Sequence, residues 1–286
     1  MRVPVEIVNA FVDGETGGNP AGVVLDADNL NTDQKLKVAP KVQLSETAFV
    51  SRSEVATIKL EFFTPERQIA HCGHATIATF SRLSELGLVK NGRMSKETID
   101  GTREIIVDGD MAYMEQRAPR YSQVANLEEV RASLGLSKDV SLESISIVNT
   151  GNSFLLIPLD GATSVSEVRP DQALIRKISD QYDLIGYYVF TTETSLPGRH
   201  AGARMFAPRY GIDEESATGM AAGPLACLLH DRLGIDAETI LIEQGRLMRP
   251  PSPSVINVSL RLSAGSIASL MAGGKGRSTR AMEVEV

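Results

Sequence analysis

The chain has 286 residues, of which 42% are hydrophobic and 23% charged, with a formal net charge of −7. This length suits one large or two medium domains, and the composition is that of an ordinary globular protein. Because the balance is acidic and no run of Lys or Arg occurs, a nucleic-acid partner is not expected. No apolar run reaches the roughly 18 residues of a transmembrane helix, so no membrane partner is expected either.

The N-terminus and the cysteines indicate the compartment. The first residues, MRVPVEIVNAF, alternate like a strand and lack the long apolar segment of a signal peptide. Two cysteines, Cys72 and Cys227, are too few for a disulfide framework. We therefore expect a cytoplasmic protein.

The N-terminal half alternates mainly with the β period. Thr32 is expected to cap a short helix that runs to Val38 and that Pro40 ends or kinks. Residues 117–122 are interpreted as a linker. The expected strands are 3–11, 21–25, the apolar end of 43–50, 58–63, and a hairpin of 103–107 with 111–115.

The C-terminal half mixes strands with helices. Short helices are expected at 127–134 and from Pro170 to about Tyr182, because proline suits a first helical turn. The glycine-rich segment 273–277 is expected to be a turn or crossover loop. The expected strands are 145–148, 154–157, 184–191, 255–262 and 281–286.

Two apolar helices are expected, at Ala75–Leu86 and Met220–Leu233. Each is apolar on more than one face, which predicts enclosed helices. Cys72, Gly73 and His74 fall where the first helix begins. Free N–H groups and the positive end of the helix dipole make such a place receptive to an anion.

The two helices lie in matching halves of the sequence. Four short matches recur in the same order at offsets of 133 to 144 residues, which argues for a duplicated domain rather than coincidence among common residues. The simplest packing wraps a curved sheet around one helix, twice. The matches are Ile7–Asn9 with Ile147–Asn149, Gly18–Asn19 with Gly151–Asn152, Phe63–Pro65 with Phe206–Pro208, and Cys72–Ala75 with Ser216–Gly219.

The duplication predicts a binding site. If a pseudo-twofold axis relates the halves, two helix starts face one cleft and present N–H groups to one ligand, and the expected ligand is a small carboxylate. The alternative is that the glycines only permit close packing of helix on strand.

Glu46 is the titratable group that the pattern singles out. It lies between apolar neighbours, Leu44 and Phe49, at the start of a strand. A carboxylate buried among apolar groups has a raised pKa, which suits it to carry a proton near neutral pH. The alternative is a solvated surface glutamate, which the pattern alone favours.

Cys72 and His74 admit several interpretations. A thiol at a helix N-terminus has a lowered pKa and can act as a base, but a two-thiol racemase needs a second thiol where this chain has Ser216. Cys72 is therefore interpreted as a small buried residue. His74 can be a general acid, a hydrogen-bond donor or a helix cap. No metal site is expected from the histidines, and no P-loop or GxGxxG motif indicates a nucleotide cofactor.

Together these stretches resemble the PhzF-like family of phenazine biosynthesis, whose fold is that of diaminopimelate epimerase. The resemblance spans nearly the whole chain in the right order. The matching stretches are Ala10–Phe11, Gly18–Gly22, Leu44–Phe49, Phe63–Pro65, Cys72–Ala75, Arg204–Pro208 and Ala217–Pro224.

The resemblance implies an α+β fold of two similar lobes, each a mostly antiparallel sheet curled around a central helix. The final strand returns to the first lobe, so the lobes are expected at 1–117 plus 272–286 and at 118–271. It also implies a cofactor-independent isomerase with its active site between the lobes, and a homodimer. The acid/base glutamate falls on Glu46, and the Gly-His pair of the first helix on Gly73 and His74.

The remaining site residues follow from the same resemblance, with departures. The second-helix motif Glu-Asp-Pro-x-Thr-Gly-Ser reads Glu-Glu-Ser-Ala-Thr-Gly-Met here, and Gly-His-Pro reads Gly-His-Ala. We therefore expect isomerase chemistry on a small acid other than the phenazine precursor, a dihydro-hydroxyanthranilate. A racemase or epimerase using Cys72 and a non-catalytic binding protein are the alternatives, and the presence of both Glu46 and His74 argues against the latter. The expected substrate-binding residues are Asn19, Gly73, Ala75, Glu215, Gly219 and Met220.

Overall fold

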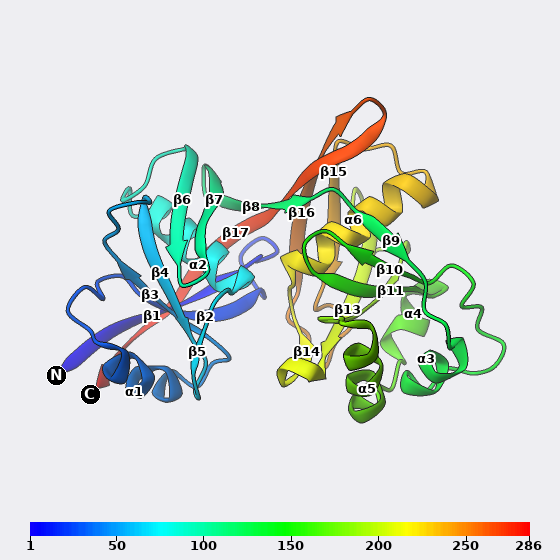
Figure 1. The fold of residues 1–286 in the computed structure, drawn as a ribbon, viewed down its shortest axis with the longest axis horizontal. Helices are drawn as coiled ribbons and strands as arrows, with labels where there is room; N and C mark the ends of the chain where they lie inside the picture. Colours follow the sequence, from blue (N-terminus) through cyan, green and yellow to red (C-terminus); the bar gives the residue numbers. More distant parts are fainter. The chain divides into compact units, whose positions relative to one another are not determined.

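The computed structural model describes all residues from 1 to 286, and the chain divides into two compact units (Figure 1). Unit 1 comprises Met1–Glu115 with Gly273–Val286, and unit 2 comprises Gln116–Ala272. Both units combine many strands with few helices, so the predicted α+β class is confirmed. No helix combines the length and the apolar character needed to cross a bilayer.

Unit 1 holds a sheet that curls around one helix. The helix α2 (Gly73–Glu85) packs against β1, β2, β3 and β7. The other helix, α1 (Thr32–Val42), lies outside the sheet near β3 and β4. The strands are β1 (Arg2–Ala10), β2 (Asn19–Val24), β3 (Thr47–Ser51), β4 (Ile58–Phe63), β5 (Gln68–Ile69), β6 (Gly92–Thr98), β7 (Gly101–Asp108), β8 (Met111–Arg117) and the long β17 (Ser266–Glu285).

Unit 2 is organised around α6 (Gly219–Leu233), which packs against β10, β11, β15 and β16. Its other helices are α3 (Leu127–Ser133), α4 (Gly161–Ser166), α5 (Gln172–Tyr182) and a 3₁₀ turn, η1 (Pro208–Tyr210). Its strands are β9 (Arg120–Ser122), β10 (Ser146–Asn149), β11 (Ser153–Pro158), β12 (Gly186–Thr191), β13 (Ala201–Ala207), β14 (Ile212–Glu215), β15 (Thr239–Gln244) and β16 (Ser254–Ser263).

The strand pairings repeat from unit to unit. In unit 1, β1 pairs antiparallel with β2, β2 parallel with β3, and β3 antiparallel with β4; β4 then pairs antiparallel with β5 and parallel with β6. In unit 2, the strands β10, β11, β12, β13, β14 and β15 make the same pairings in the same order. Each central helix follows the fifth strand of its series. The duplication read from short sequence matches is therefore present in the topology.

Both central helices are enclosed, as predicted. In α2 every residue from His74 to Ser81 is buried, and in α6 every residue from Ala221 to Leu229 is buried. The C-terminal ends reach solvent at Leu86 and Leu233, and the first residues of each helix, Gly73, Gly219 and Met220, are half-buried. A helix with apolar residues around its whole circumference is stable only inside such a shell.

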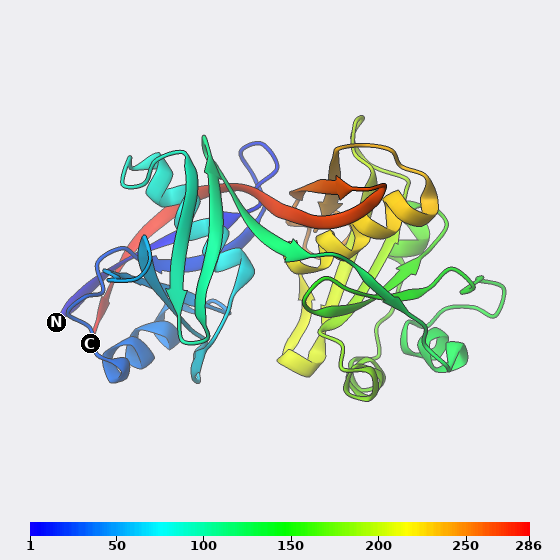
Figure 2. The same ribbon diagram turned by 45° about the horizontal axis from the view of Figure 1, so that its top comes forward.

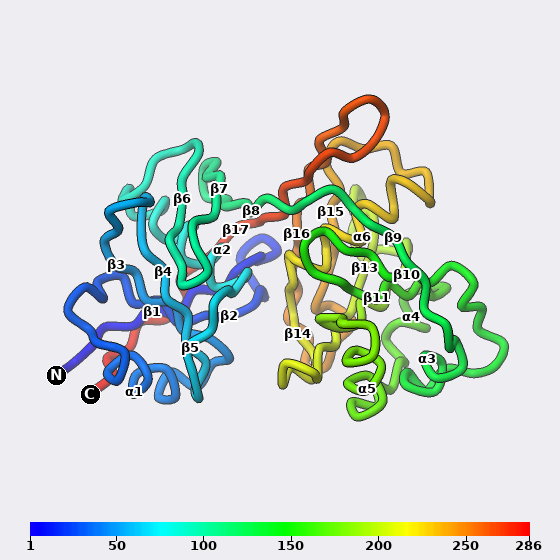
Figure 3. Tube along the Cα trace, viewed as in Figure 1, coloured from blue at the N-terminus to red at the C-terminus, as the bar shows by residue number.

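The chain ends lie together in unit 1 (Figure 3). The N-terminal ammonium of Met1 donates to the carbonyl of Val286 at 2.7 Å. Residues 276–285 of β17 pair antiparallel with β1, and Figure 2 shows this red strand beside the blue one. The final strand thus returns to the first unit.

The glycine-rich segment 273–277 corrects one expectation, because it is part of β17 and not a turn. A Cβ atom at Gly273 would lie 2.2 Å from the carbonyl oxygen of Ala112, and one at Gly276 would lie 2.7 Å from Cβ of Ser81. These glycines permit close approach of β17 to β8 and α2. The fold therefore requires the small size of these two glycines rather than their conformational freedom.

Other expectations were wrong at element borders. The first helix continues through Pro40 to Val42, and its N-cap is Asn31, which forms a capping box with Gln34. The expected linker contains β9, which pairs with β10. The strand β6 and the helix α4 were not predicted.

Candidate active site

Glu46 and His74 meet at the start of the enclosed helix α2. Glu46 lies directly before β3 and is 9% exposed, and its backbone carbonyl accepts a hydrogen bond from the N–H of Gly22 on β2. His74 is the second residue of α2 and is 5% exposed. The carboxylate Oε2 of Glu46 is 3.4 Å from Nε2 of His74. A buried carboxylate and an imidazole at this distance are of the types that can exchange a proton.

Cys72 extends the pair on the other side of the ring. It occupies the N-cap position of α2 without capping the helix through its side chain, and its Sγ lies 3.6 Å from Nδ1 of His74. Cys72 is buried, as interpreted from the sequence, but it also contacts His74, which the sequence did not predict. The thiol, the imidazole and the carboxylate form one cluster, in which both ring nitrogens have a neighbour.

The same three side chains are of types that bind metals. One ligand atom of each of Glu46, Cys72 and His74 lies within 4.8 Å of the others. However, the thiol approaches Nδ1 and the carboxylate approaches Nε2, so no single ring nitrogen faces both of the other groups. This arrangement favours a chain of proton carriers over a shared ion.

The first turn of α2 is anchored from behind. The N–H of Thr76 makes the first intrahelical bond, to the carbonyl of Cys72 at 3.2 Å, and the Thr76 hydroxyl donates to the same carbonyl at 2.6 Å. The N–H groups of Gly73, His74 and Ala75 precede this bond and belong to the dipole-positive end of the helix. A buried lysine, Lys96 of β6, donates to the Thr76 hydroxyl at 2.6 Å.

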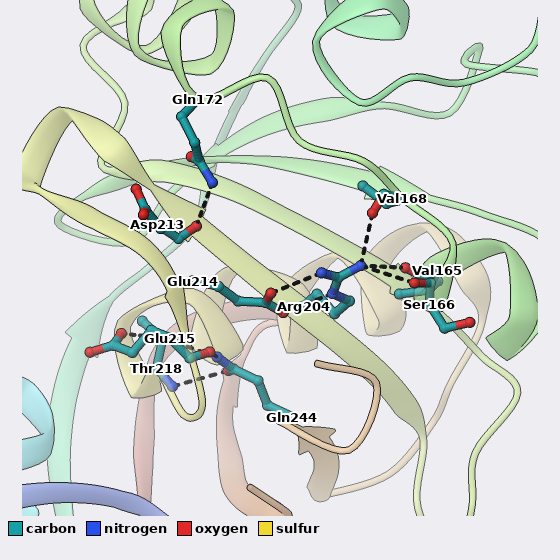
Figure 4. Close-up of polar contacts among 10 residues, drawn as sticks. All are labelled: Val165, Ser166, Val168, Gln172, Arg204, Asp213, Glu214, Glu215, Thr218 and Gln244. Carbon is teal, nitrogen blue, oxygen red and sulfur yellow. Dashed lines mark hydrogen bonds and ion pairs between the residues drawn. The ribbon is translucent and has the colours of Figure 1, made fainter. Parts of the chain in front are cut away.

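In unit 2 the corresponding helix start carries a carboxylate but no imidazole. Glu215 ends β14, and its carboxylate accepts a hydrogen bond from the Thr218 hydroxyl (Figure 4). Gln244 of β15 is fully buried and holds this turn: its Oε1 accepts from the Thr218 N–H at 3.0 Å, and its Nε2 donates to the Glu215 carbonyl at 2.7 Å. The Tyr188 hydroxyl also donates to Gln244 Oε1, at 2.8 Å.

Arg204 on β13 fixes the strand that carries Glu215. Its guanidinium makes two hydrogen bonds of 2.7 and 2.8 Å to the carboxylate of Glu214 (Figure 4). The remaining nitrogen, Nη1, donates to backbone carbonyls at the end of α4, those of Val165, Ser166 and Val168. This bidentate buried pair holds β14 against β13 and α4.

The other predicted site residues occupy structured positions. Asn19 is buried at the start of β2, and Gly73 and Ala75 belong to the first turn of α2. Gly219 is the first residue of α6, and its carbonyl accepts from Gln116 at 2.8 Å. Met220 follows, and its sulfur accepts from Asn152 Nδ2 at 3.4 Å.

The structure therefore brings Glu46 and His74 together within unit 1 and adds Cys72 to them. The roles assigned to Asn19, Gly73, Ala75, Glu215, Gly219 and Met220 stay predictions. Sequence reasoning missed Lys96 and Gln244. The only signal for Lys96 was its position two residues before Thr98, which places both residues on the same face of a strand. Without knowledge of which face of that strand is buried, a lysine is taken to be exposed.

Two units of one topology, each wrapped around a helix, with a carboxylate and an imidazole in contact at one helix start, define a diaminopimelate epimerase-like fold. The model of the PhzC-PhzF family, described as phenazine biosynthesis-like protein, matches residues 8–276. The chain belongs to this family. The predicted family and the prediction of an isomerase are confirmed.

Individual relatives agree. The chain is 31% identical over 276 residues to the "uncharacterized isomerase YddE" of Escherichia coli O157:H7, covering 91% of this chain and 92% of that protein. It is 29% identical to a trans-2,3-dihydro-3-hydroxyanthranilate isomerase of Pseudomonas chlororaphis, covering 85% and 86%. The crystal structure of a PhzF-family phenazine biosynthesis protein from Bacillus anthracis superposes with a TM-score of 0.90 at 27% identity, covering 100% of both chains.

Proposed function

We propose that this protein is a cofactor-independent isomerase that moves a proton within a small unsaturated carboxylic acid. Glu46 removes the proton from carbon, the electron pair moves along the conjugated system, and the same carboxyl group returns the proton to a different atom. No electrons leave the substrate, so the step needs no oxidant or reductant. The chemistry requires only a group that can alternate between base and acid.

The observation that carries the proposal is the contact of 3.4 Å between Glu46 Oε2 and His74 Nε2 at the start of a buried helix. His74 lies beside the reacting carboxyl and is proposed to fix its orientation, which matters because a misplaced base loses much of its rate advantage. Burial removes competing water from the carboxylate. Glu46 and His74 are the proposed catalytic residues.

The substrate carboxylate is proposed to bind at the first turn of α2, at Gly73 and Ala75. The dipole-positive end of a helix and its N–H groups stabilise an anion, including charge that develops during the shift. Asn19 and the residues Glu215, Gly219 and Met220 of the second helix start are proposed to contact the same substrate in a cleft between the lobes, a prediction made from the sequence.

The second helix start of this chain differs from the family motif. Two relatives, from Pseudomonas chlororaphis and Pseudomonas aeruginosa, are named trans-2,3-dihydro-3-hydroxyanthranilate isomerases. Here the carboxylate of Glu215 is engaged by Thr218, and Met220 offers a thioether where the family motif has a hydroxyl. We propose that the substrate is a different unsaturated acid. It carries an apolar group near Met220, at the position where a relative's substrate would carry a polar group bound by the serine hydroxyl of the family motif.

The test is deuterium incorporation in D₂O. Wild-type protein is incubated with a panel of small unsaturated acids that includes trans-2,3-dihydro-3-hydroxyanthranilate, and the positions of deuterium are read by NMR. Turnover with deuterium at a shifted position supports the proposal. Loss of exchange in Glu46→Gln, with retained melting temperature, assigns the base. Exchange at the wild-type rate in Glu46→Gln removes Glu46 from that role.

A racemase or epimerase remains the second candidate, favoured by one observation, the distance of 3.6 Å between Cys72 Sγ and His74 Nδ1. A thiol next to an imidazole can be activated to remove a proton from carbon. If Cys72→Ala abolishes exchange while Glu46→Gln retains it, and the product is the mirror-image or epimeric acid, this second function replaces the first. Cytoplasmic location and a homodimer stay predictions from the sequence.

A further inference from the structure

Lys96 is a buried lysine without a carboxylate among its hydrogen-bonding partners. It is 0% exposed, and its ammonium contacts only the Thr76 hydroxyl at 2.6 Å, Nδ1 of His71 at 3.4 Å and the face of Phe62, whose ring centroid is 5.0 Å away. The other buried lysine of unit 1, Lys35, forms an ion pair with Glu61. A buried charge without such a partner is costly, so its place needs an explanation other than stability.

The hydrogen bonds of Lys96 have a fixed direction. An ammonium has three donors and no acceptor, so the Thr76 oxygen must accept from Lys96 and send its own proton elsewhere. That proton goes to the Cys72 carbonyl at 2.6 Å. For the same reason Nδ1 of His71 must accept, which leaves the proton of the neutral ring on Nε2.

These contacts continue into the proposed active site. The Cys72 carbonyl held by Thr76 belongs to the N-cap of α2, and the Cys72 thiol touches Nδ1 of His74. His74 in turn contacts Glu46. Lys96, Thr76, Cys72, His74 and Glu46 therefore form one chain of contacts inside unit 1.

We infer that Lys96 is a positioning residue for the acid–base cluster, acting through the Thr76 hydroxyl to hold the Cys72–His74 turn and adding a positive charge behind the anion-binding helix start. This inference rests on the proposed function of Glu46 and His74. Because Lys96 does not touch the substrate, its effect reaches the reaction only through the geometry and charge of that turn.

The surroundings of Lys96 lower its pKa. Burial lowers the pKa of Lys96 to about 7; Cys72 and Asp100 act in the opposite direction, and Arg103 adds to the lowering. Burial, then the charge of Lys96, lowers the pKa of His71 to about 3, with Asp100 opposing and Arg103 adding. His71 is thus neutral, and Lys96 is the basic group of the pair that titrates near neutral pH.

This has a definite consequence for stability. A lysine in the unfolded chain keeps its proton up to about pH 10.5, whereas the folded chain releases the Lys96 proton near pH 7. Between these values the unfolded state binds more protons, so the Lys96 contribution raises the free energy of unfolding as pH rises. Below pH 7 both states carry the charge, and the folded state bears the full burial cost.

The experiment compares Lys96→Met, Thr76→Val and Thr76→Ser with the matched control Lys35→Met. Lys96→Met removes a costly charge, so we expect a melting temperature at pH 6 no lower than that of wild type, and an advantage that declines between pH 7 and pH 10. Lys35→Met leaves Glu61 buried without its partner, so we expect a lower melting temperature at pH 6.

The positioning role is read from the imidazole ¹⁵N signals and from kinetics. We expect Lys96→Met and Thr76→Val to shift the His74 signals and to lower kcat about tenfold, Thr76→Ser to stay near wild type, and Lys35→Met to leave the His74 signals in place. Unchanged His74 signals in both Lys96→Met and Thr76→Val overturn the inference, and so does a melting temperature of Lys96→Met that falls as in Lys35→Met.

Folding and the proposed function are separated in this design. If Lys96→Met does not fold, Thr76→Val, which keeps the charge and loses only the hydroxyl, decides the question through the His74 signals. If wild type turns over no acid of the panel, the proposed function fails, while the His74 signals and melting curves still support or overturn the role of Lys96.

Discussion

The starts of α2 and α6 have the same place in two units of the same topology, yet they carry different chemistry. At α2 a thiol, an imidazole and a carboxylate lie in contact, with a buried lysine behind them. At α6 the nearest polar groups are the Glu215 carboxylate, a threonine hydroxyl and the neutral amide of Gln244. Neither helix is capped by its N-cap side chain.

The difference teaches how a duplicated fold separates two tasks. At the α2 start an imidazole lies between a thiol and a carboxylate, and the two ring nitrogens of an imidazole can accept and donate a proton. The α6 start has a carboxylate whose position is fixed by a hydroxyl and by a buried amide that does not titrate. We therefore expect the first start to carry the reaction and the second to bind and orient. The predictions below test that division, from the largest expected effect to the smallest.

The largest effect is expected from exchanging one carboxylate at each helix start for an amide. Glu46→Gln should lower kcat by about 10²–10⁴, the usual cost of removing a general acid/base. Glu215→Gln should act mainly on KM, because it removes a binding contact. Steady-state kinetics on the acid found in the deuterium screen measures both. A larger loss of kcat in Glu215→Gln than in Glu46→Gln would reverse the assignment of the two starts.

The next largest effect is expected at Arg204, which holds the strand that leads to the start of α6. Arg204→Met leaves the Glu214 carboxylate, whose side chain is 17% exposed, without its partner, and breaking a buried pair costs up to about 3–5 kcal/mol of unfolding free energy. Arg209→Met is the matched control: Arg209 pairs with the exposed carboxylates of Asp180 and Asp183 and should cost at most about 1 kcal/mol. Urea unfolding followed by circular dichroism compares the two, and equal midpoints would contradict the role of the Arg204 pair.

A smaller effect is expected at Gln244. Gln244→Leu removes the acceptor of the Thr218 N–H and the donor to the Glu215 carbonyl, and a buried group left unpaired costs about 1–3 kcal/mol. Because the Glu215 turn then loosens, KM should rise while kcat changes little. Gln172→Leu, which removes a bond from a partly exposed side chain to the Asp213 carbonyl, is the control. A fall in kcat alone would indicate that the second start takes part in proton transfer.

The smallest effect is expected from restoring a second thiol. Ser216→Cys places sulfur where a two-thiol racemase would need it. The two histidines of unit 2 contact other groups: His230 pairs with Asp231 at the far end of α6, and His200 accepts from the N–H of Leu241. A thiol with an ordinary pKa of about 8.5 is a poor base near neutral pH. Chiral analysis of the product should show no racemisation. Racemisation gained in Ser216→Cys would support the racemase as this protein's function.

The elements that the sequence predicted well are those with a strong period or a local stop signal. The strand 58–63 and the helices that begin near residues 73 and 219 are examples, because apolar pattern and helix end determine them locally. The strand β17 was largely missed, because its glycines read as a turn. Only the approach of Ala112 and Ser81 explains why Gly273 and Gly276 lie in a strand.

The residues of the candidate site also differ in whether the sequence could identify them. Glu46 and His74 were identified because they fall on motifs of the PhzF-like family, whereas burial pattern alone favoured a solvated Glu46. The contact of Cys72 with His74 could be anticipated from their spacing at one helix start, yet the sequence did not rank it above simple burial. Lys96 and Gln244 lie on strands far along the chain from the turns that they hold, so no local pattern points to them.

By itself the sequence determined that the chain is duplicated, that each half encloses one apolar helix, and that each helix begins at a glycine-containing turn. These properties follow from periodicity and short-range backbone preferences, which are written along the chain. Only the tertiary structure decided that Glu46, 28 positions before His74, lies 3.4 Å from its ring, and that Lys96 enters from another strand behind the same turn. Such contacts depend on which strands pair, and pairing between distant segments is fixed by the packing of the whole core rather than by neighbouring residues.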